Sequence, residues 1–322
     1  MHPVEHRDFY LVLETLIATV MPMFNQSLME SRAPHYQHTR IHVAVLENNS
    51  ATPAISKDVR NFTPPQQRTT GQFIDREHRW LNWLYVDLKK EFWSRGLQMV
   101  CEVREIDLGP DQPSFEGEEW HVQGQRNEYI CASAILTYSV HNLTQPRLSF
   151  RRRVWTEEAA IAWGYISEPP FAPEIYGANS GDPAIQHIGN LDMRQGRLVT
   201  FPNIWQTRLL PFELADKSRP GHFKILVLHL IDPNRRIIST SRVPPQRRDW
   251  WAKEVRRQNA VLWRLPNEIW DNVVATLEGY PLSIEEAEHL RNEFVEERAE
   301  FQKKHTEAMM EYGEWDLYSD AE

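Results

Sequence analysis

The chain has 322 residues, of which 41% are hydrophobic and 25% charged, and its formal net charge is −9. This balance is typical of a folded globular protein, and the negative charge opposes general attraction to nucleic acid or anionic lipid. Two cysteines provide neither a disulfide framework nor paired zinc ligands. No segment approaches about 18 uninterrupted apolar residues, so we expect a cytoplasmic protein that binds neither nucleic acid nor membrane.

Helical periodicity opens the chain and returns near its end. Apolar residues at helical spacing over 9–21 predict a helix that Pro22 ends. Near the C-terminus, Ser283 and Glu286 form a capping-box pattern that opens a charged helix running to about His305. Residues 307–322 hold six acids and no base, which predicts a frayed acidic tail. The other elements expected before the β region are a strand over 42–46, a long polar loop over 47–72 and a helix over 80–92 that ends before Gly96.

The hydrophobic period changes from 3.6 to 2 after Gly96, which predicts that a β region begins there. Many short strands with long connections favour a sandwich or jelly roll over a parallel α/β sheet. We therefore expect an α+β protein with a mainly β core, a jelly roll or double-stranded β-helix, flanked by N- and C-terminal helices. One domain over 1–306 would comprise a helical part (1–96), a β-barrel core (97–245) and C-terminal helices (246–306). The strand candidates are 99–103, 120–122, 129–138, 148–154, 197–201 and 224–231.

The most suggestive cluster lies in the segment EGEEWHVQG, where His121 and Gln123 share one face of an expected strand. A His-x-Asp/Glu pair on a strand, joined by a distant His, is the facial triad of non-haem iron oxygenases. A single strand histidine is more often an ordinary structural residue. The pair by itself therefore does not establish a metal site.

Two further clusters have alternative interpretations. Three histidines within 35–42 invite a metal site, but they stand in a loop without carboxylate neighbours. Eight Lys or Arg between 235 and 257, with Trp250 and Trp251 interleaved, could bind phosphates or bases, or form a solvated helix face or a partner for the acidic tail. Neither GxGxxG, a Walker loop, GxSxG, HExxH nor paired CxxC occurs, so nucleotide binding, serine hydrolysis and zinc proteolysis have no support.

A series of ordered blocks runs from Glu116 to Trp251. The blocks are EGEEWHVQGQRNEYICASA, LSFRRRVW, EIYG, GRLVTFPN, PFELAD, GHFKILVLHLIDP and RIISTSRVPPQRRDWW. As a whole they resemble a fungal family catalogued as domain of unknown function 4246. That family is similar to Fe(II)/2-oxoglutarate oxygenases, so the resemblance implies a double-stranded β-helix core.

The resemblance also implies where an iron site would lie. Its parts are a His-x-Glu pair, a distal histidine, and an arginine that binds the carboxylate of the co-substrate. Here His121 is kept, but Gln123 stands at the glutamate position, Thr207 at the distal histidine and Phe223 at the arginine. A neutral amide and a hydroxyl are poor ligands for Fe(II), and Phe223 lacks the guanidinium fork that grips a carboxylate. We therefore expect no metal and no other cofactor.

The leading expectation is a metal-independent, non-redox enzyme of fungal secondary metabolism, an isomerase or cyclase with a small-molecule substrate. His121 or Arg208 would handle protons or charge. Two alternatives stay open: a non-catalytic binding or scaffold protein, and an Fe(II)/2-oxoglutarate oxygenase with an atypical site. An enzyme predicts a deep pocket with His121 exposed inside it, whereas a scaffold predicts that Phe223 and its neighbours fill that space. The expected pocket is lined by Trp120, Gln123, Asn127, Trp205, Thr207 and Phe223.

Overall fold

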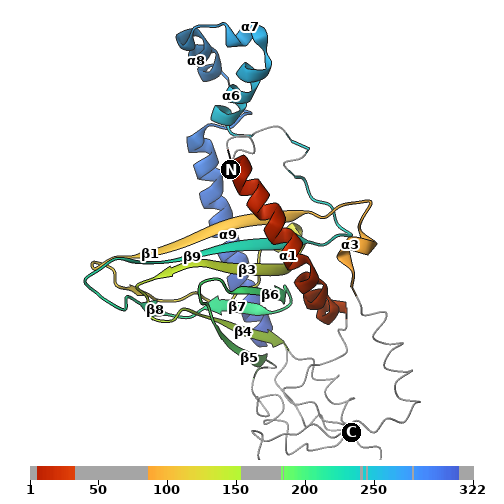
Figure 1. Ribbon diagram of the computed structural model, residues 1–322, viewed down its shortest axis with the longest axis vertical. Helices are drawn as coiled ribbons and strands as arrows, with labels where there is room; N and C mark the ends of the chain where they lie inside the picture. Colours follow the sequence, from red (N-terminus) through yellow and green to blue (C-terminus); the bar gives the residue numbers. More distant parts are fainter. Residues whose placement is uncertain are drawn as a thin grey trace, which may run out of the picture.

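The computed structural model describes residues 6–32, 86–153, 183, 185–239, 242–243, 246–277 and 279–311. These residues form an α+β arrangement, in which antiparallel sheets are flanked by helices (Figure 1). The helices are α1 (Arg7–Arg32), α3 (Leu88–Glu91), the 3-10 helix η2 (Arg126–Glu128), α6 (Arg248–Gln258), α7 (Ala260–Trp263), α8 (Asn267–Ala275) and α9 (Ile284–Glu311). The strands are β1 (Met99–Leu108), β2 (Ser114–Phe115), β3 (Ile130–His141), β4 (Arg147–Arg153), β5 (Ile185–Asp192), β6 (Leu198–Pro202), β7 (Gln206–Leu209), β8 (Phe212–Glu213) and β9 (Gly221–Ile231).

The strands are organised in two larger sheets and one short pair. The four-stranded sheet has the order β1-β9-β3-β6, the three-stranded sheet has the order β5-β4-β7, and β2 pairs with β8. All of these pairings are antiparallel. Because side chains alternate along a strand, β9 contributes to a core on each of its faces. Phe223, Ile225 and Val227 enter one core, and Leu226, Leu228 and Leu230 enter the other.

The first core lies between the two larger sheets and is rich in aromatic rings. Phe150 of β4 meets Phe201 of β6 edge to face, with ring centroids 5.4 Å apart. Phe212 and Phe223 form a similar contact at 5.8 Å. Each of these four side chains is at least nine-tenths buried, so their rings fill the space between the sheets.

Helix α1 covers the opposite face of the four-stranded sheet. The prediction that this helix ends at Pro22 is wrong, because α1 continues through Pro22 to Arg32. Pro22 lies on the exposed side of the helix, whereas Val20 and Phe24 are fully buried on the sheet side. Burying such side chains stabilises the helix by roughly 1.5–3 kcal/mol each, which offsets the cost of about 3 kcal/mol for an interior proline.

Residues Arg7–Met29 of α1 are also long and apolar enough to cross a membrane, judged by length and composition alone. In the structure Leu13, Val20, Phe24 and Leu28 form one buried stripe against the sheet. A helix that packs in a protein core needs the same apolar composition. Only 17% of this segment is buried, so the packing of the stripe on the sheet accounts for part of the apolar character of α1.

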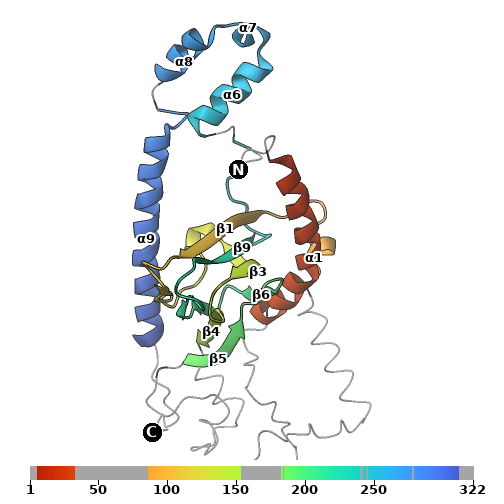
Figure 2. The ribbon, with the colours of Figure 1, turned by 60° about the vertical axis from the view of Figure 1, so that its left-hand side comes forward.

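Helix α9 lies on the side of the strands opposite to α1, and α6, α7 and α8 project beyond the sheets at one end (Figure 2). The predicted capping box is confirmed: Ser283 Oγ accepts from Glu286 N at 3.1 Å, and Glu286 Oε2 accepts from Ser283 N at 2.8 Å. The prediction that a frayed tail begins at 307 is wrong, since α9 continues to Glu311. Residues 312–322 lie outside the described residues.

Five strand predictions are confirmed, as β1, β3, β4, β6 and β9. The strand expected over 120–122 is reduced to an isolated bridge between His121 and Thr207. Within the described part of the helix predicted over 80–92, only the short α3 forms, and Gly96 beyond it has the positive φ of +67° typical of glycine at a chain reversal. The predictions over 35–46 and 47–72 lie outside the described residues.

Candidate functional site

Backbone pairing brings together the positions that the resemblance aligns with iron ligands. The His121 N–H donates to the Thr207 carbonyl at 3.0 Å, and the Thr207 N–H donates to the His121 carbonyl at 2.8 Å. Side chains of residues paired in this way point to the same side, and Gln123, two residues after His121, joins them there. His121, Gln123 and Thr207 therefore form one cluster.

The amide of Gln123 connects the other two side chains. Nδ1 of His121 lies 2.9 Å from the Glu119 carbonyl oxygen, which can only accept, so Nδ1 bears the hydrogen and Nε2 keeps its lone pair. The amide nitrogen of Gln123 lies 3.3 Å from that Nε2 atom and donates to Thr207 Oγ1 at 3.2 Å. Both amide hydrogens of Gln123 are thus used. The NH2 group stands between the imidazole and the hydroxyl, where a cation would have to bind.

The donor atoms of this cluster do not fit Fe(II). The Nε2 lone pair of His121 already accepts a hydrogen bond, and the group nearest to it is an amide nitrogen, which is not a metal ligand. Gln123 and Thr207 are only 4% and 1% exposed, and their side chains are hydrogen-bonded to each other. Across the ranges that the structure describes, no group of three His, Cys, Asp or Glu side chains is placed to hold a metal ion.

The other predicted pocket residues on this side have varied surroundings. Phe223 is 1% exposed and belongs to the core between the sheets, and Trp205 packs against that core with its ring 5.9 Å from that of Phe150. Asn127 is exposed on η2. One residue that the sequence reasoning missed is Asn203, whose side chain bonds both the backbone N–H and the carbonyl of Gln123 at 2.8 Å.

Trp120 and Arg208 lie on the opposite face of the same two segments. The guanidinium carbon of Arg208 is 4.6 Å from the centroid of the Trp120 ring. Because neighbouring residues alternate along a strand, Arg208 points away from the side of β7 that bears Thr207. The structure thus does not bring His121 and Arg208 to one pocket.

Helix α9 holds the segment of His121 in place through side-chain contacts with its backbone. Gln302 Oε1 accepts from Val122 N at 3.1 Å, and Gln302 Nε2 donates to the Val122 and Gly124 carbonyls at 2.8 and 3.1 Å. Thr306 Oγ1 donates to the Trp120 carbonyl at 2.9 Å. Gln302 therefore satisfies backbone groups that a neighbouring strand would satisfy in a sheet.

Part of the basic segment over 235–257 is paired with acidic side chains of the described residues. Arg247 pairs with Asp249 at 2.7 Å, and Arg257 pairs with Glu254 at the same distance. Arg248 lies 3.8 Å from Glu286 of α9. These ion pairs favour the interpretation of a paired, solvated helix face over that of a phosphate-binding surface.

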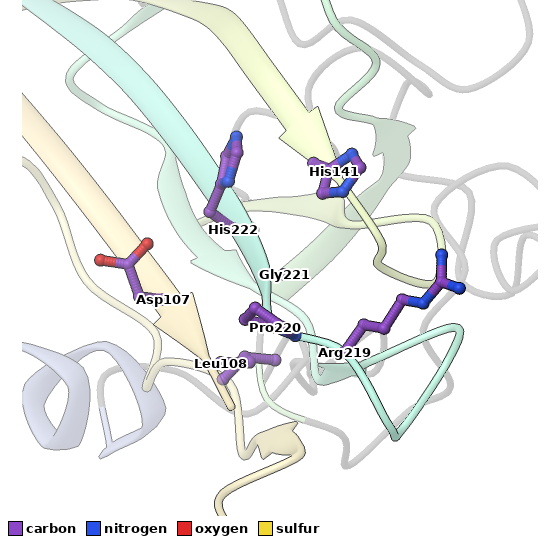
Figure 3. Close-up of a pocket in the computed structure, with 7 residues that line it drawn as sticks. All are labelled: Asp107, Leu108, His141, Arg219, Pro220, Gly221 and His222. Atoms are coloured by element: carbon purple, nitrogen blue, oxygen red, sulfur yellow. The ribbon is translucent and has the colours of Figure 1, made fainter. Parts of the chain in front are cut away.

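Two cavities lie on the outer face of the four-stranded sheet, away from His121. A groove of about 890 Å³ runs beside α1 and is lined mainly by apolar side chains, with Glu105 and Tyr138 among its polar groups. A second cavity of about 440 Å³ contains His141 and His222 from adjacent strands, with Asp107 on the next strand and Arg219 in the preceding loop (Figure 3). His222 Nε2 lies 2.8 Å from Ser139 Oγ. Neither cavity is lined by a predicted site residue.

A scan against protein-family models matches residues 1–254 to the family described as Protein of unknown function (DUF4246). The chain therefore belongs to this family. A search of curated proteins found no match.

Solved structures similar to the chain include two hydroquinone 1,2-dioxygenases. One is PnpCD in complex with Cd2+ and 4-hydroxybenzonitrile, with a TM-score of 0.22, 14% identity, and coverage of 42% of this chain and 61% of that one. The other is from Sphingomonas sp. TTNP3 with 4-hydroxybenzoate bound, with a TM-score of 0.21, 12% identity, and coverage of 47% and 75%. The chain thus spans less than two thirds of the first of these proteins. Overlaps of this size establish neither a shared fold nor a shared activity.

Proposed function

We propose that the chain is a metal-free, non-catalytic binding protein of the fungal cytoplasm, built on an oxygenase-like double-stranded β-helix. One observation supports it above all: the Gln123 amide is hydrogen-bonded between His121 and Thr207, in the place of a metal ion. The buried Gln123 carboxamide satisfies the hydrogen-bonding groups of its two neighbours, and such an arrangement is typical of a structural role. The ligand of such a protein would be a small molecule, bound away from the closed cluster.

The filled interior supports the same proposal. A scaffold predicts that Phe223 and its neighbours fill the space between the sheets, and among the described residues Phe223 and the rings around it are buried in that core. The open volumes of about 890 and 440 Å³ lie on the other face of the four-stranded sheet. The former is within the usual range for small-ligand sites, roughly 300–1,000 Å³.

The proposal is tested by the iron content of protein loaded anaerobically with Fe(II), together with a titration with 2-oxoglutarate. We expect neither to bind. The double substitution Gln123→Glu with Thr207→His supplies a carboxylate and a second imidazole, and should raise iron affinity at least about tenfold. A matched control makes the same chemical changes at the exposed Gln112 and Thr144. Stoichiometric iron in the unchanged protein would overturn the proposal and make an oxygenase the leading function.

A non-redox isomerase or cyclase is the second candidate. It is favoured by the partial exposure of His121 and by the bond from Nδ1 to the Glu119 carbonyl, which orients the ring as in many general bases. This candidate predicts that the protein converts a small molecule and that His121→Asn abolishes the conversion without changing the melting temperature by more than a few degrees. Conversion that persists in His121→Asn would rule out His121 as its base.

A further inference from the structure

Two arginines beside the Trp120 ring have no acidic partner among the described residues. The guanidinium carbons of Arg151 and Arg208 lie 4.5 and 4.6 Å from the ring centroid. Arg151 is 6% exposed, and among the described residues its side chain donates one hydrogen bond, from Nε to Gln206 Oε1 at 2.7 Å. Nη2 of Arg151 and Nε of Arg208 are buried without any hydrogen-bond partner among the described residues. Buried guanidinium nitrogens with unused hydrogens are rare in proteins.

The electrostatics of this cluster are unfavourable without an anion. Burial first, and then the positive charge of Arg208, lower the pKa of Arg151 to about 10, so that the Arg151 side chain stays charged at neutral pH. Burial and these two arginines also lower the pKa of the neighbouring His187. No carboxylate of the described residues contributes to either of these pKa shifts. Buried charges in proteins are normally paired, and an unpaired one is strongly destabilising.

Stacking on Trp120 explains only part of this arrangement. A cation–π contact satisfies the face of a guanidinium group, whereas its N–H groups point outward in the plane of the group. The unpartnered Nη2 and Nε atoms are therefore not accounted for by the tryptophan. Two planar donor groups that meet beside one ring match the oxygens of a carboxylate or phosphate.

Neighbouring elements of the described residues hold the two arginines. Arg151 and Arg208 project from β4 and β7 on the outer face of the three-stranded sheet. Gln206, which holds Arg151, is itself bonded to Thr306 of α9 at 3.1 Å. His187 of β5 is exposed, and its ring centroid is 5.9 Å from that of Trp120. His187 is thus the exposed member of this cluster.

We propose that Arg151 and Arg208, with Trp120 as a wall and His187 at the entrance, bind a small dianion, a phosphate or a dicarboxylate. The proposal rests on the binding role proposed above and names a ligand class for it. It concerns the face of β7 opposite to Thr207. The iron assay therefore tests the cluster of His121, Gln123 and Thr207, whereas the anion titration tests the two arginines. The proposed function and the anion site can thus be contradicted independently of each other.

The test is calorimetric titration of the full chain with inorganic phosphate, sulfate and succinate, each against sodium chloride at equal ionic strength. We expect at least one dianion to bind and to raise the melting temperature, which chloride does not. Binding of phosphate and sulfate alone identifies a tetrahedral oxyanion, and binding of succinate alone identifies a dicarboxylate. Absence of binding by all three overturns the proposal, and would be the result if an acidic group outside the described residues neutralised the arginines.

Variants locate the site. Arg208→Gln removes one charge from a partly exposed position and should lower the affinity for the dianion at least tenfold. Without ligand, this variant should melt no lower than the unchanged chain, because the repulsion between Arg208 and Arg151 is relieved. Arg151→Met tests the second arginine in the same way. The control is Arg147→Gln, an exposed residue of the same strand β4, which should bind as the unchanged chain does. Equal affinity in Arg208→Gln and the unchanged chain would overturn the assignment.

Discussion

The hydroxyl of Ser133 lies 2.8 Å from Nδ1 of His229, and both side chains are buried between β3 and β9. His229 Nε2 lies 3.7 Å from Glu102 Oε2, and Arg104 Nε donates to the other carboxylate oxygen of Glu102 at 2.7 Å. The interaction with His229, together with Arg104, lowers the pKa of Glu102 well below its usual range despite its partial burial. Glu102 therefore stays ionised under conditions in which other carboxylates take up protons.

This chain of contacts predicts a pH dependence of stability. A carboxyl group with a lowered folded-state pKa stabilises the fold above its ordinary pKa, and this stabilisation is lost as the pH falls toward the lowered value. The free energy of unfolding of the unchanged chain should therefore fall between pH 6 and pH 3 by about 1 kcal/mol more than that of Glu102→Gln. This figure is reduced for solvent screening, because the Glu102 side chain is 37% exposed. Urea denaturation at both pH values measures this difference. Glu213→Gln is the control, since its ion pair with Lys217 is largely exposed; an equal effect there would contradict the role of Glu102.

The contact of α1 with the sheet predicts a large effect of truncating Phe24. This side chain is fully buried in the second core, so Phe24→Ala should lower the free energy of unfolding by about 3–5 kcal/mol. Val12→Ala, on the same helix but 61% exposed, should change it by less than about 0.5 kcal/mol. Denaturant melts of the two variants give the comparison. A small effect of Phe24→Ala would show that α1 does not pack on the sheet as described.

Pro22 should reduce the stability of α1. Its ring removes one backbone hydrogen bond from the interior of the helix, and its side chain gains no compensating burial because it is exposed. Pro22→Ala should therefore raise the free energy of unfolding by about 1–3 kcal/mol. Thermal unfolding followed by circular dichroism measures the change. A lower melting temperature in the variant would mean that the bend imposed by proline is needed for packing.

Gly221 opens β9 at a point where another part of the backbone comes very close. A Cβ atom added there would lie 2.7 Å from the Asn142 carbonyl oxygen and 2.8 Å from that of His141. Gly221→Ala should destabilise the fold by about 1–3 kcal/mol, because backbone atoms cannot move aside as a flexible side chain can. At Gly109 an added Cβ meets nothing within 4 Å, so Gly109→Ala serves as the matched control. Similar melting temperatures for the two variants would contradict this close approach.

The sequence predicted the strands whose residues alternate, such as β1, or form an apolar run, such as β9, and it missed the polar strand β7. Strand β7 reads Gln-Thr-Arg-Leu, yet Gln206 and Thr207 are 0% and 1% exposed, because each finds hydrogen-bond partners on its own side of the sheet. A polar strand that is buried on both faces has no periodic signal. The helix that continues through Pro22 was missed for a related reason, since the burial of Val20 and Phe24 depends on a sheet formed by distant residues.

Within the candidate site, the family resemblance was the effective guide. It placed His121, Gln123 and Thr207 at equivalent positions, and the structure joins them through one amide group. Composition and spacing could not reveal that Arg151 and Arg208 both lie beside Trp120, because the run Arg151 to Arg153 has the character of a solvated strand end. Burial of charge depends on three-dimensional contacts that a local pattern does not contain.

The contacts of Gln302 with the backbone at Val122 and Gly124 limit how far the chain can be truncated from its C-terminal side. The family match ends at residue 254, whereas the side chain that completes the hydrogen bonding of the His121 segment comes from α9. A fragment ending at 254 would leave these amide and carbonyl groups without the Gln302 side chain, and the segment would keep the bridge to Thr207 and the bonds of Asn203 to Gln123. The hydrogen bonding of this segment thus extends beyond the region that the family match covers, and expression trials should retain the chain through Glu311.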